Sequence, residues 1–406
     1  MVLARHRDIG YATSFPQELV DLVIGFLHED ISTLKNCTIV SRKWTYKSRI
    51  HLLRTITFDL TPSALIIRHS LDDALKNKFS LLQQILTSSP NLKEYIHSVE
   101  LKNLQLQNEK EGDAYEVLAS ILMSLLRVER FSLNNLRWYN CTESLKGAIS
   151  HLLQLSTIKH VELQAFAVRE RLSLMRLLTY PTNLTFLHLK RIECRDYHRG
   201  DEMVNEKQAF AVRELKAFYV DATHCSCLFD WILAPKSSLN LGGLTTLHIS
   251  DGCRPNFAER LLRLAGASLE HLELGMGYVF DSHLLNIHLS DLPRLKSLEL
   301  VAESSISLIQ KLFNKLDQPH PLQQISVTGA TPNSGVCNWG ILNSHFAQPA
   351  LKQLRQVEFQ IVEKDWDEDD LEMLYDQFPT LEKRDILRIR EVKGKSALDH
   401  YLSSPS

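Results

Sequence analysis

The segment Leu295-Lys296-Ser297-Leu298-Glu299-Leu300 carries the pattern that decides the fold of this 406-residue chain, with apolar residues at its first, fourth and sixth positions. The fourth and sixth residues are two apart, so in a β-strand both point to one face and the residue between them points to the other. The pattern occurs eleven times: Leu53-Ile56-Phe58, Ile96-Val99-Leu101, Val128-Phe131-Leu133, Ile158-Val161-Leu163, Leu184-Leu187-Leu189, Leu215-Phe218-Val220, Leu244-Leu247-Ile249, Leu269-Leu272-Leu274, Leu295-Leu298-Leu300, Leu322-Ile325-Val327 and Leu354-Val357-Phe359.

The pattern returns at a nearly constant spacing. After a first gap of 43 residues, its successive first positions lie 25 to 32 residues apart. The stretches between them have the apolar periodicity of helices. Helices are therefore expected at 114–126, 145–155, 168–178, 258–265, 306–316 and 371–378. One strand and one helix cannot bury their apolar faces alone, so neighbouring units must stack into a continuous array.

In pattern and period this array resembles the leucine-rich repeats. The resemblance implies an α/β fold over residues 55–390, a solenoid with a parallel sheet on its concave face and helices on its convex face. Most units lack the Asn or Cys that follows the strand in that family, with Asn135 and Cys253 as partial exceptions, so we expect an irregular array. Insertions are expected at 103–113, 192–206 and 329–339.

The residues between the apolar strand positions are predicted to face outward, where they offer a surface to a protein substrate. Glu273, Glu299 and Glu358 have no matching lysine or arginine in this set, which favours a basic segment on the partner. The alternative is that these are ordinary solvated strand residues. The predicted substrate-binding residues are His188, Lys190, Tyr219, Asp221, His248, Glu273, Glu299 and Glu358.

Residues 14–54 have a different periodicity from the array. Apolar residues recur at three- and four-residue steps over 15–27, and a second run covers 34–44, which predicts two short helices joined by a tight turn. Ser14 is the expected cap of the first helix and Ser32-Thr33 of the second. So small a module buries little apolar surface alone, which indicates that a partner covers its exposed apolar positions.

A second resemblance is to the F-box motif of the substrate adaptors of SCF-type ubiquitin ligases. It is carried by Phe15-Pro16-Gln17-Glu18-Leu19, Ile24, Leu27, Leu34, Cys37, Val40-Ser41, Trp44 and His51-Leu52-Leu53-Arg54. In that family the motif forms a small helical bundle that docks on the Skp adaptor, which in turn binds a cullin-RING ligase. Phe15 departs from the family, which usually has leucine there. The docking residues that the resemblance implies are Phe15, Pro16, Leu19, Ile24, Leu27, Val40 and Trp44.

Together the two resemblances imply a non-catalytic adaptor: an F-box module at 14–54, a repeat domain at 55–390 that binds a protein substrate, and a polar tail at 391–406. One alternative is a binding scaffold outside any ligase, in which the helical module only caps the array. A weaker alternative is an enzyme that uses the cysteines and histidines of 194–227. Their spacing differs from the paired CxxC of zinc sites, so neither a metal nor a cofactor is expected.

Composition limits the possible partners and compartments. The chain has 48 acidic and 46 basic residues, which give a formal net charge of −2 and no overall basic field that would attract nucleic acid. Its seven cysteines are scattered and odd in number, as fits a reducing compartment. No signal-peptide pattern or membrane-length apolar run is found. We therefore expect a soluble protein of the cytoplasm or nucleus, without a membrane partner.

Overall fold

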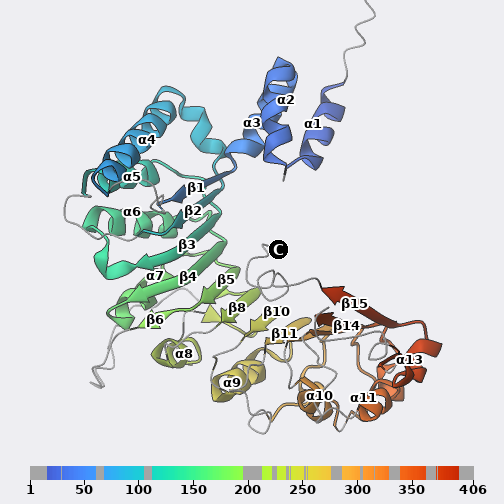
Figure 1. The fold of residues 1–406 in the computed structure, drawn as a ribbon. Coiled ribbons are helices and arrows are strands. Elements are labelled where there is room, and N and C mark those ends of the chain that lie inside the picture. Colours follow the sequence, from blue (N-terminus) through green and yellow to red (C-terminus); the bar gives the residue numbers. More distant parts are fainter. Residues whose placement is uncertain are drawn as a thin grey trace, which may run out of the picture.

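The computed structural model shows an α/β protein built on one large parallel sheet (Figure 1). Its strands follow one another in the order β1-β2-β3-β4-β5-β8-β10-β11-β12-β13-β14-β15, and a short further strand, β6, pairs with β4. The structure describes residues 16–28, 30–60, 68–104, 112–194, 213–221, 226–234, 237, 239–250, 253, 255–275, 286–301, 305–314, 316–328, 339–362, 372 and 374–392.

Each predicted apolar pattern forms a strand of this sheet. The eleven strands are β1 (Thr55–Asp59), β2 (Ser98–Lys102), β3 (Arg130–Arg137), β4 (His160–Val168), β5 (Phe186–Lys190), β8 (Ala217–Asp221), β10 (Thr246–Ile249), β11 (His271–Gly275), β12 (Ser297–Val301), β13 (Gln324–Thr328) and β14 (Gln356–Val362). Equivalent motif positions lie side by side, as where Leu298 pairs with Leu272 and Ile325. All three are buried in one core that runs through the array, as the alternation of the strands predicts.

A twelfth strand, β15 (Leu387–Val392), closes the sheet and was not predicted. Its motif would begin at Arg384, where the other units have an apolar residue. The Arg384 guanidinium donates a hydrogen bond from Nη2 to the backbone oxygen of Leu354, 2.9 Å away. A charged side chain at the end of the array thus satisfies a carbonyl of the preceding unit, and its presence hid the repeat from a search for apolar patterns.

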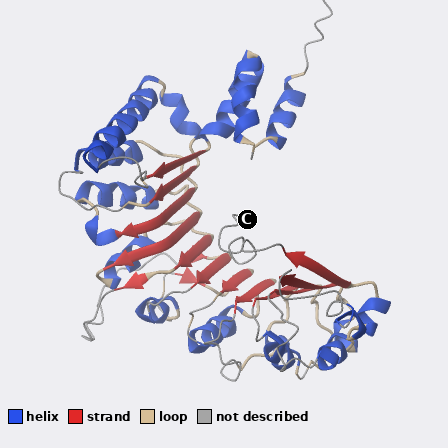
Figure 2. Ribbon diagram, viewed as in Figure 1, coloured by secondary structure: helices blue, strands red, loops and turns tan. Residues whose placement is uncertain are grey.

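Helices cover one face of the sheet (Figure 2). They are α4 (Arg68–Ser88), α5 (Gly112–Met123), α6 (Glu143–Gln154), α7 (Arg171–Thr179), α8 (Ser226–Ile232), α9 (Pro255–Ala265), α10 (Ser305–Phe313), α11 (Trp339–Phe346) and α13 (Pro379–Lys383). Short 3-10 helices are η1 (Pro90–Tyr95), η3 (Trp138–Asn140), η5 (Leu289–Asp291) and η6 (Pro349–Leu351). Two small strands, β7 (Arg213–Glu214) and β9 (Leu239–Asn240), pair with each other, and β6 spans Glu193–Cys194.

The predicted helices differ from the observed ones at several points, and α11 and α13 were not predicted at all. The 21-residue helix α4 fills much of the first 43-residue gap and was not predicted. Val168 was predicted to begin a helix, but it ends β4, and α7 begins only at Arg171. A β-branched residue that extends an apolar strand favours the sheet, which explains the error. Of the helix predicted at 371–378, residues 372 and 374–376 are helical, and the predicted insertions lie largely outside the described residues.

The first units share a conformation just after the inward-facing strand residues. Asn103, Asn135, Ala165 and Arg191 each follow the last motif residue by two positions, and all four have positive φ, from 48° to 58°. Asn is among the residues that tolerate this left-handed region best. The Asn135 side chain donates to Asn103 Oδ1 at 2.9 Å, and the Asn103 side chain donates to the Asp59 carboxylate at 3.0 Å. Asn135 was noted in the sequence as a partial exception to the missing Asn, and in the structure Asn103 occupies the equivalent position.

The N-terminal module contains three helices rather than the predicted two: α1 (Gln17–Phe26), α2 (Ile31–Val40) and α3 (Arg42–Leu53). Ser41 separates α2 from α3 because its backbone is extended, with φ −161° and ψ 163°. Its carbonyl then accepts the first bonds of α3, from the N–H groups of Trp44 at 3.1 Å and Thr45 at 2.9 Å. Figure 1 places this module at the end of the sheet that begins with β1.

The predicted caps of the module are wrong. The cap position of α1 is Pro16, whose carbonyl accepts from the N–H groups of Leu19 and Val20, both at 3.2 Å. The cap of α2 is Asp30, whose carboxylate accepts from the Thr33 N–H at 2.9 Å and from the Thr33 hydroxyl at 2.6 Å. Ser14 lies outside the described residues. An aspartate one residue before the helix competes well for this position, since its carboxylate also stabilises the helix N-terminus.

Among the described residues, none of the helices is both long enough and apolar enough to span a membrane.

Candidate functional site

The N-terminal module has a core of its own. Val20, Ile24 and Leu34 are at most 1% exposed and form a cluster separate from the core of the array. Leu27, Trp44 and Leu52 pack against this cluster while remaining partly exposed. Three of the residues that the F-box resemblance implies for docking, Ile24, Leu27 and Trp44, therefore hold the bundle together. Ile24 is fully buried, so any contribution it makes to docking acts through the position of α1.

Several large apolar side chains remain exposed on the same module. Two of the implied docking residues belong to it, Leu19 at 44% and Val40 at 63% exposure, and Pro16 is also exposed. Phe15 lies outside the described residues. We call the whole group the apolar face of the module; its members are Leu19, Leu22, Val23 and Phe26 on α1, and Ile31, Ile39 and Val40 on α2.

Two of the most exposed members of this face were not among the implied docking residues. Phe26 is 79% exposed and Ile39 is 83% exposed. The signal for them was present in the sequence, because α1 carries apolar residues on more than one side, as the neighbouring pair Leu19-Val20 shows. A short helix that buries only one apolar side leaves the other side for a partner.

The predicted substrate-binding residues mostly lie in one row across the face of the sheet that the helices do not cover, which we call the open face. Strand register places Glu162 beside His188, His188 beside Tyr219, and Tyr219 beside His248. The row continues through Glu273, Glu299, Ser326 and Glu358. Lys190 and Asp221 pair with each other two positions further along their strands, but both are buried, at 5% and 8% exposure, and so do not lie exposed to a substrate as predicted.

Aromatic rings form a continuous strip in the middle of this row. The rings of Tyr219 and His248 stack with centroids 5.4 Å apart, and those of His188 and Tyr219 lie 5.7 Å apart. Phe186 extends the strip, with its centroid 5.0 Å from Tyr219 and 3.6 Å from the stacked ring of His160. Three of these rings were predicted to lie on this surface; His160 and Phe186 were missed, and they stand two residues before Glu162 and His188 on the same strands.

The charged groups beside the strip are largely paired with one another. His188 Nδ1 lies 3.3 Å from Glu162 Oε1, and the hydrogen bond from this imidazole holds the pKa of the Glu162 carboxyl below its usual value. His248 Nδ1 lies 2.6 Å from Glu273 Oε2, but the nitrogen is not aligned for a hydrogen bond. The Lys190 ammonium lies 3.4 Å from the Asp221 carboxylate.

Glu358 differs from the prediction made for it. Glu273, Glu299 and Glu358 were predicted to have no matching lysine or arginine, but the register places Arg388 of β15, a strand that was not predicted, beside Glu358. The side chains of Gln356 and Gln360 also donate to the Glu358 carboxylate, at 2.8 and 3.0 Å. Glu358 therefore stands apart from the aromatic strip. Glu273 lies beside His248 of the strip, and Glu299 lies beside Glu273 on the next strand.

The part of the chain that the structure describes contains no group of three or more histidine, cysteine or acidic side chains placed to hold a metal ion. The cysteine and histidine region considered as an alternative site is only partly described: Cys194 lies on β6, whereas His198, His224 and Cys225 lie outside the described residues.

Comparison with models of known protein families gives no match for this chain, and comparison with curated protein sequences gives none either.

Proposed function

We propose that this protein is the substrate-recognition adaptor of a cullin-RING ubiquitin ligase, with an F-box module that docks the Skp adaptor and a leucine-rich-repeat solenoid that binds the substrate. The observation that supports docking most directly is the apolar face of the module. Phe26, 79% exposed, and Ile39, 83% exposed, stand on a module whose own core contains only three fully buried apolar residues. Several large apolar side chains exposed on one small module favour a protein partner.

The repeat assignment is supported by the periodic features of the array. Parallel strands follow one another in chain order, each returns through a segment that contains a helix in most units, and equivalent leucines stack across the units. The left-handed residues Asn103, Asn135, Ala165 and Arg191 recur at the same position after the strand. Such repetition is expected of a solenoid in which each unit contacts only its neighbours.

The module is less well suited to be only a cap of the array. A cap directs its apolar side at the repeat that it covers, whereas Val20, Ile24 and Leu34 form a core separate from that of the array. The module reaches the array through α3 and η1, where the rings of Tyr46 and Tyr95 meet edge to face at 6.1 Å. The apolar face is therefore not explained by contact with the first repeat.

The docking proposal is tested by co-expression with a Skp adaptor and size-exclusion chromatography of the wild type and the Phe26→Asp variant. Phe26 is exposed, so the substitution leaves the bundle core unchanged, but it places a charge in an apolar interface. We expect the affinity to fall about thirtyfold or more, enough to lose the complex on the column. Trp44→Ala is a poorer test, because Trp44 packs against the bundle core and its loss would also unfold the module.

The matched control is Leu264→Asp, on α9 of the array. Leu264 is 52% exposed, so it tests the effect of a new surface aspartate far from the module in the sequence. This variant should elute with the Skp adaptor as the wild type does. If the folded wild type elutes alone, docking is refuted and a scaffold outside any ligase takes its place.

For the substrate we propose a segment rich in lysine or arginine, bound along the open face. Glu273 and Glu299 lie next to the aromatic strip in the same row of the open face. Carboxylates attract ammonium and guanidinium groups.

A further inference from the structure

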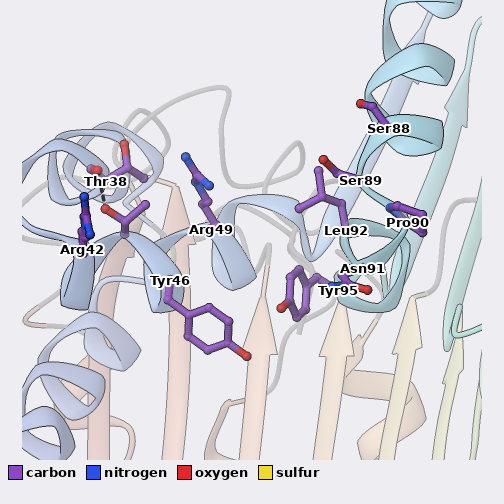
Figure 3. A pocket seen from close by; sticks show the side chains of 11 residues that line it. Thr38, Arg42, Tyr46, Arg49, Ser88, Ser89, Pro90, Asn91, Leu92 and Tyr95 are labelled. Carbon is purple, nitrogen blue, oxygen red and sulfur yellow. Dashed lines mark hydrogen bonds between the residues drawn. The ribbon is translucent and has the colours of Figure 1, made fainter.

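A groove lies between the helical module and the first units of the array. It has a volume of about 790 Å³, and Figure 3 shows Arg42, Tyr46 and Arg49 of α3 on one side and Asn91 and Tyr95 of η1 on the other. Its full lining is Thr38, Arg42, Thr45, Tyr46, Arg49, Ser88, Ser89, Pro90, Asn91, Leu92 and Tyr95. This lining contains two arginines and no aspartate or glutamate.

The positive charge of the groove belongs to a larger excess on the module. Residues 31–54 contain six lysines and arginines (Lys35, Arg42, Lys43, Lys47, Arg49 and Arg54) and no acidic residue, a formal net charge of +6 in a chain whose total is −2. The pKa of His51 is lowered, first by partial burial and then by the positive charges of Lys47 and Arg54, which is the response expected inside such a field.

Arg42 and Arg49 make no ion pair with any acidic side chain in the described part of the chain. Both side chains are exposed, so their charges are not buried without compensation. The charges of the open face differ, because Lys190 there has Asp221 as its partner at 3.4 Å. The groove therefore keeps two guanidinium groups available for a negatively charged ligand.

The hydrogen-bond donors of the groove limit what it can bind. The hydroxyls of Thr38, Thr45 and Ser88 already donate to backbone carbonyls, at 2.7 to 3.1 Å. The donors that remain for a ligand include the Ser89 hydroxyl, the Asn91 amide and the guanidinium groups of Arg42 and Arg49, and of these only the guanidinium groups carry charge. These planar groups match carboxylates in a bidentate geometry, and each such charge-assisted pair is stronger than a neutral hydrogen bond.

The edge-to-face contact between Tyr46 and Tyr95 forms the apolar side of the groove. A hydrogen bond between the two phenols, followed by desolvation, raises the pKa of Tyr95. The two rings add aromatic surface to the groove. A peptide backbone can pack against such rings while its side chains reach the arginines on either side.

We propose that this groove is the docking site for an acidic peptide segment of a protein partner, held by Arg42 and Arg49. The two residues are seven positions apart on α3, which places them about 10 Å apart along the helix axis. An extended peptide advances roughly 3.3 Å per residue, so carboxylates about three residues apart would reach both guanidinium groups. Thr38 lines the groove and Ile39 and Val40 belong to the apolar face, so one partner can occupy both surfaces.

The inference does not depend on the partner being a Skp adaptor, and the test needs none. A short fluorescein-labelled peptide in which Asp and Glu alternate with Gly and Ser is titrated with the full chain, and binding is followed by fluorescence anisotropy. The wild type should bind it, more weakly at high salt because exposed charges are screened. The double variant Arg42→Ala, Arg49→Ala should bind at least about tenfold more weakly.

The control is the double variant Lys352→Ala, Arg355→Ala, which removes two exposed positive charges from the other end of the chain. It should bind as the wild type does. The milder pair Arg42→Gln, Arg49→Gln repeats the test should the alanine variant fail to fold, as judged by circular dichroism. Equal weakening in the control, no binding by the wild type, or tighter binding of an oligonucleotide of equal charge would each overturn the proposal.

Discussion

The helical module and the repeat array bury their apolar residues in opposite ways. In the array each unit is covered by the next, and leucines such as Leu247 and Leu298 are fully buried. The module buries only three apolar side chains completely, yet eight of the fourteen large apolar side chains found exposed among the described residues lie between residues 19 and 46. The array therefore buries its apolar side chains within itself, whereas the module leaves large apolar side chains exposed, as a surface that binds a partner does.

The same contrast holds for charge. On the open face of the array, carboxylates lie close to histidine and lysine side chains, as where Glu162 meets His188 at 3.3 Å. On the module, Arg42 and Arg49 have no such partner among the described residues. Unpaired charge and exposed apolar surface occur together at one end of the chain, which indicates that this end is the more specialised for binding.

The largest effect expected from this contrast is on stability. Leu298→Ala should lower the free energy of unfolding of the array by about 2 to 5 kcal/mol, since it leaves a cavity in a core that neighbouring units share. Ile24→Ala should act locally, because its core is separate: it should unfold the module and leave the urea midpoint of the array unchanged. Urea denaturation followed by hydrogen exchange of α1–α3 measures both effects.

Phe26→Ala is the surface control for these two variants, because its side chain is 79% exposed. It should change stability by less than about 0.5 kcal/mol. Loss of array stability in Ile24→Ala would show that the module and the array unfold as one unit, and the comparison between them would then fail.

A smaller effect concerns pH and the stacked rings of the open face. Burial, and secondarily Arg130, lower the pKa of His160 from 6.5 to about 4, although Glu162 opposes the shift. The unfolded chain therefore binds more protons than the folded chain between pH 6.5 and 4, so stability is lost as the pH falls through this window. The expected loss is roughly 2 to 3 kcal/mol.

The variant His160→Phe isolates this contribution, because phenylalanine can keep the stack on Phe186 and does not titrate. The groups that face His160 are Arg130, Glu162 and His188, and all three are retained. His320, whose pKa is also lowered by burial, remains as a background with the same sign. Urea midpoints measured from pH 7 to pH 4 should fall less steeply in the variant, and an unchanged slope would contradict the argument.

The repeat architecture could be predicted because it depends on a local period. An apolar residue at every second strand position must face a core, and eleven of the twelve strands on the main path of the sheet were found from that rule alone. The twelfth was missed because Arg384 replaces the first apolar residue of its pattern. Helix α4 was missed because it occupies a gap longer than the period that the other units have.

The residues exposed on the module and in the groove were predicted less completely, because they depend on which side of each helix is buried. The sequence shows apolar residues on several sides of α1, and the packing of Leu34 on α2 and of Trp44 and Leu52 on α3 separates buried Ile24 from exposed Phe26. The groove beside Arg49 joins residues 38–49 to residues 88–95, a contact that no local pattern contains. On the open face, alternation predicted which residues face outward, but the register that sets Arg388 beside Glu358 required the strand that was missed.

The smallest effect concerns ligand affinity at the open face. If Glu273 and Glu299 attract a basic segment, then Glu273→Gln combined with Glu299→Gln should weaken binding of a labelled lysine- and arginine-rich peptide several-fold, about 1 kcal/mol, because the sites are partly exposed to solvent. Glu259→Gln, on helix α9 beside Arg263, removes a carboxylate away from the open face and should leave binding unchanged. Equal loss in both proteins would mean that overall charge attracts the peptide, and the aromatic strip would then be a packing feature of the sheet.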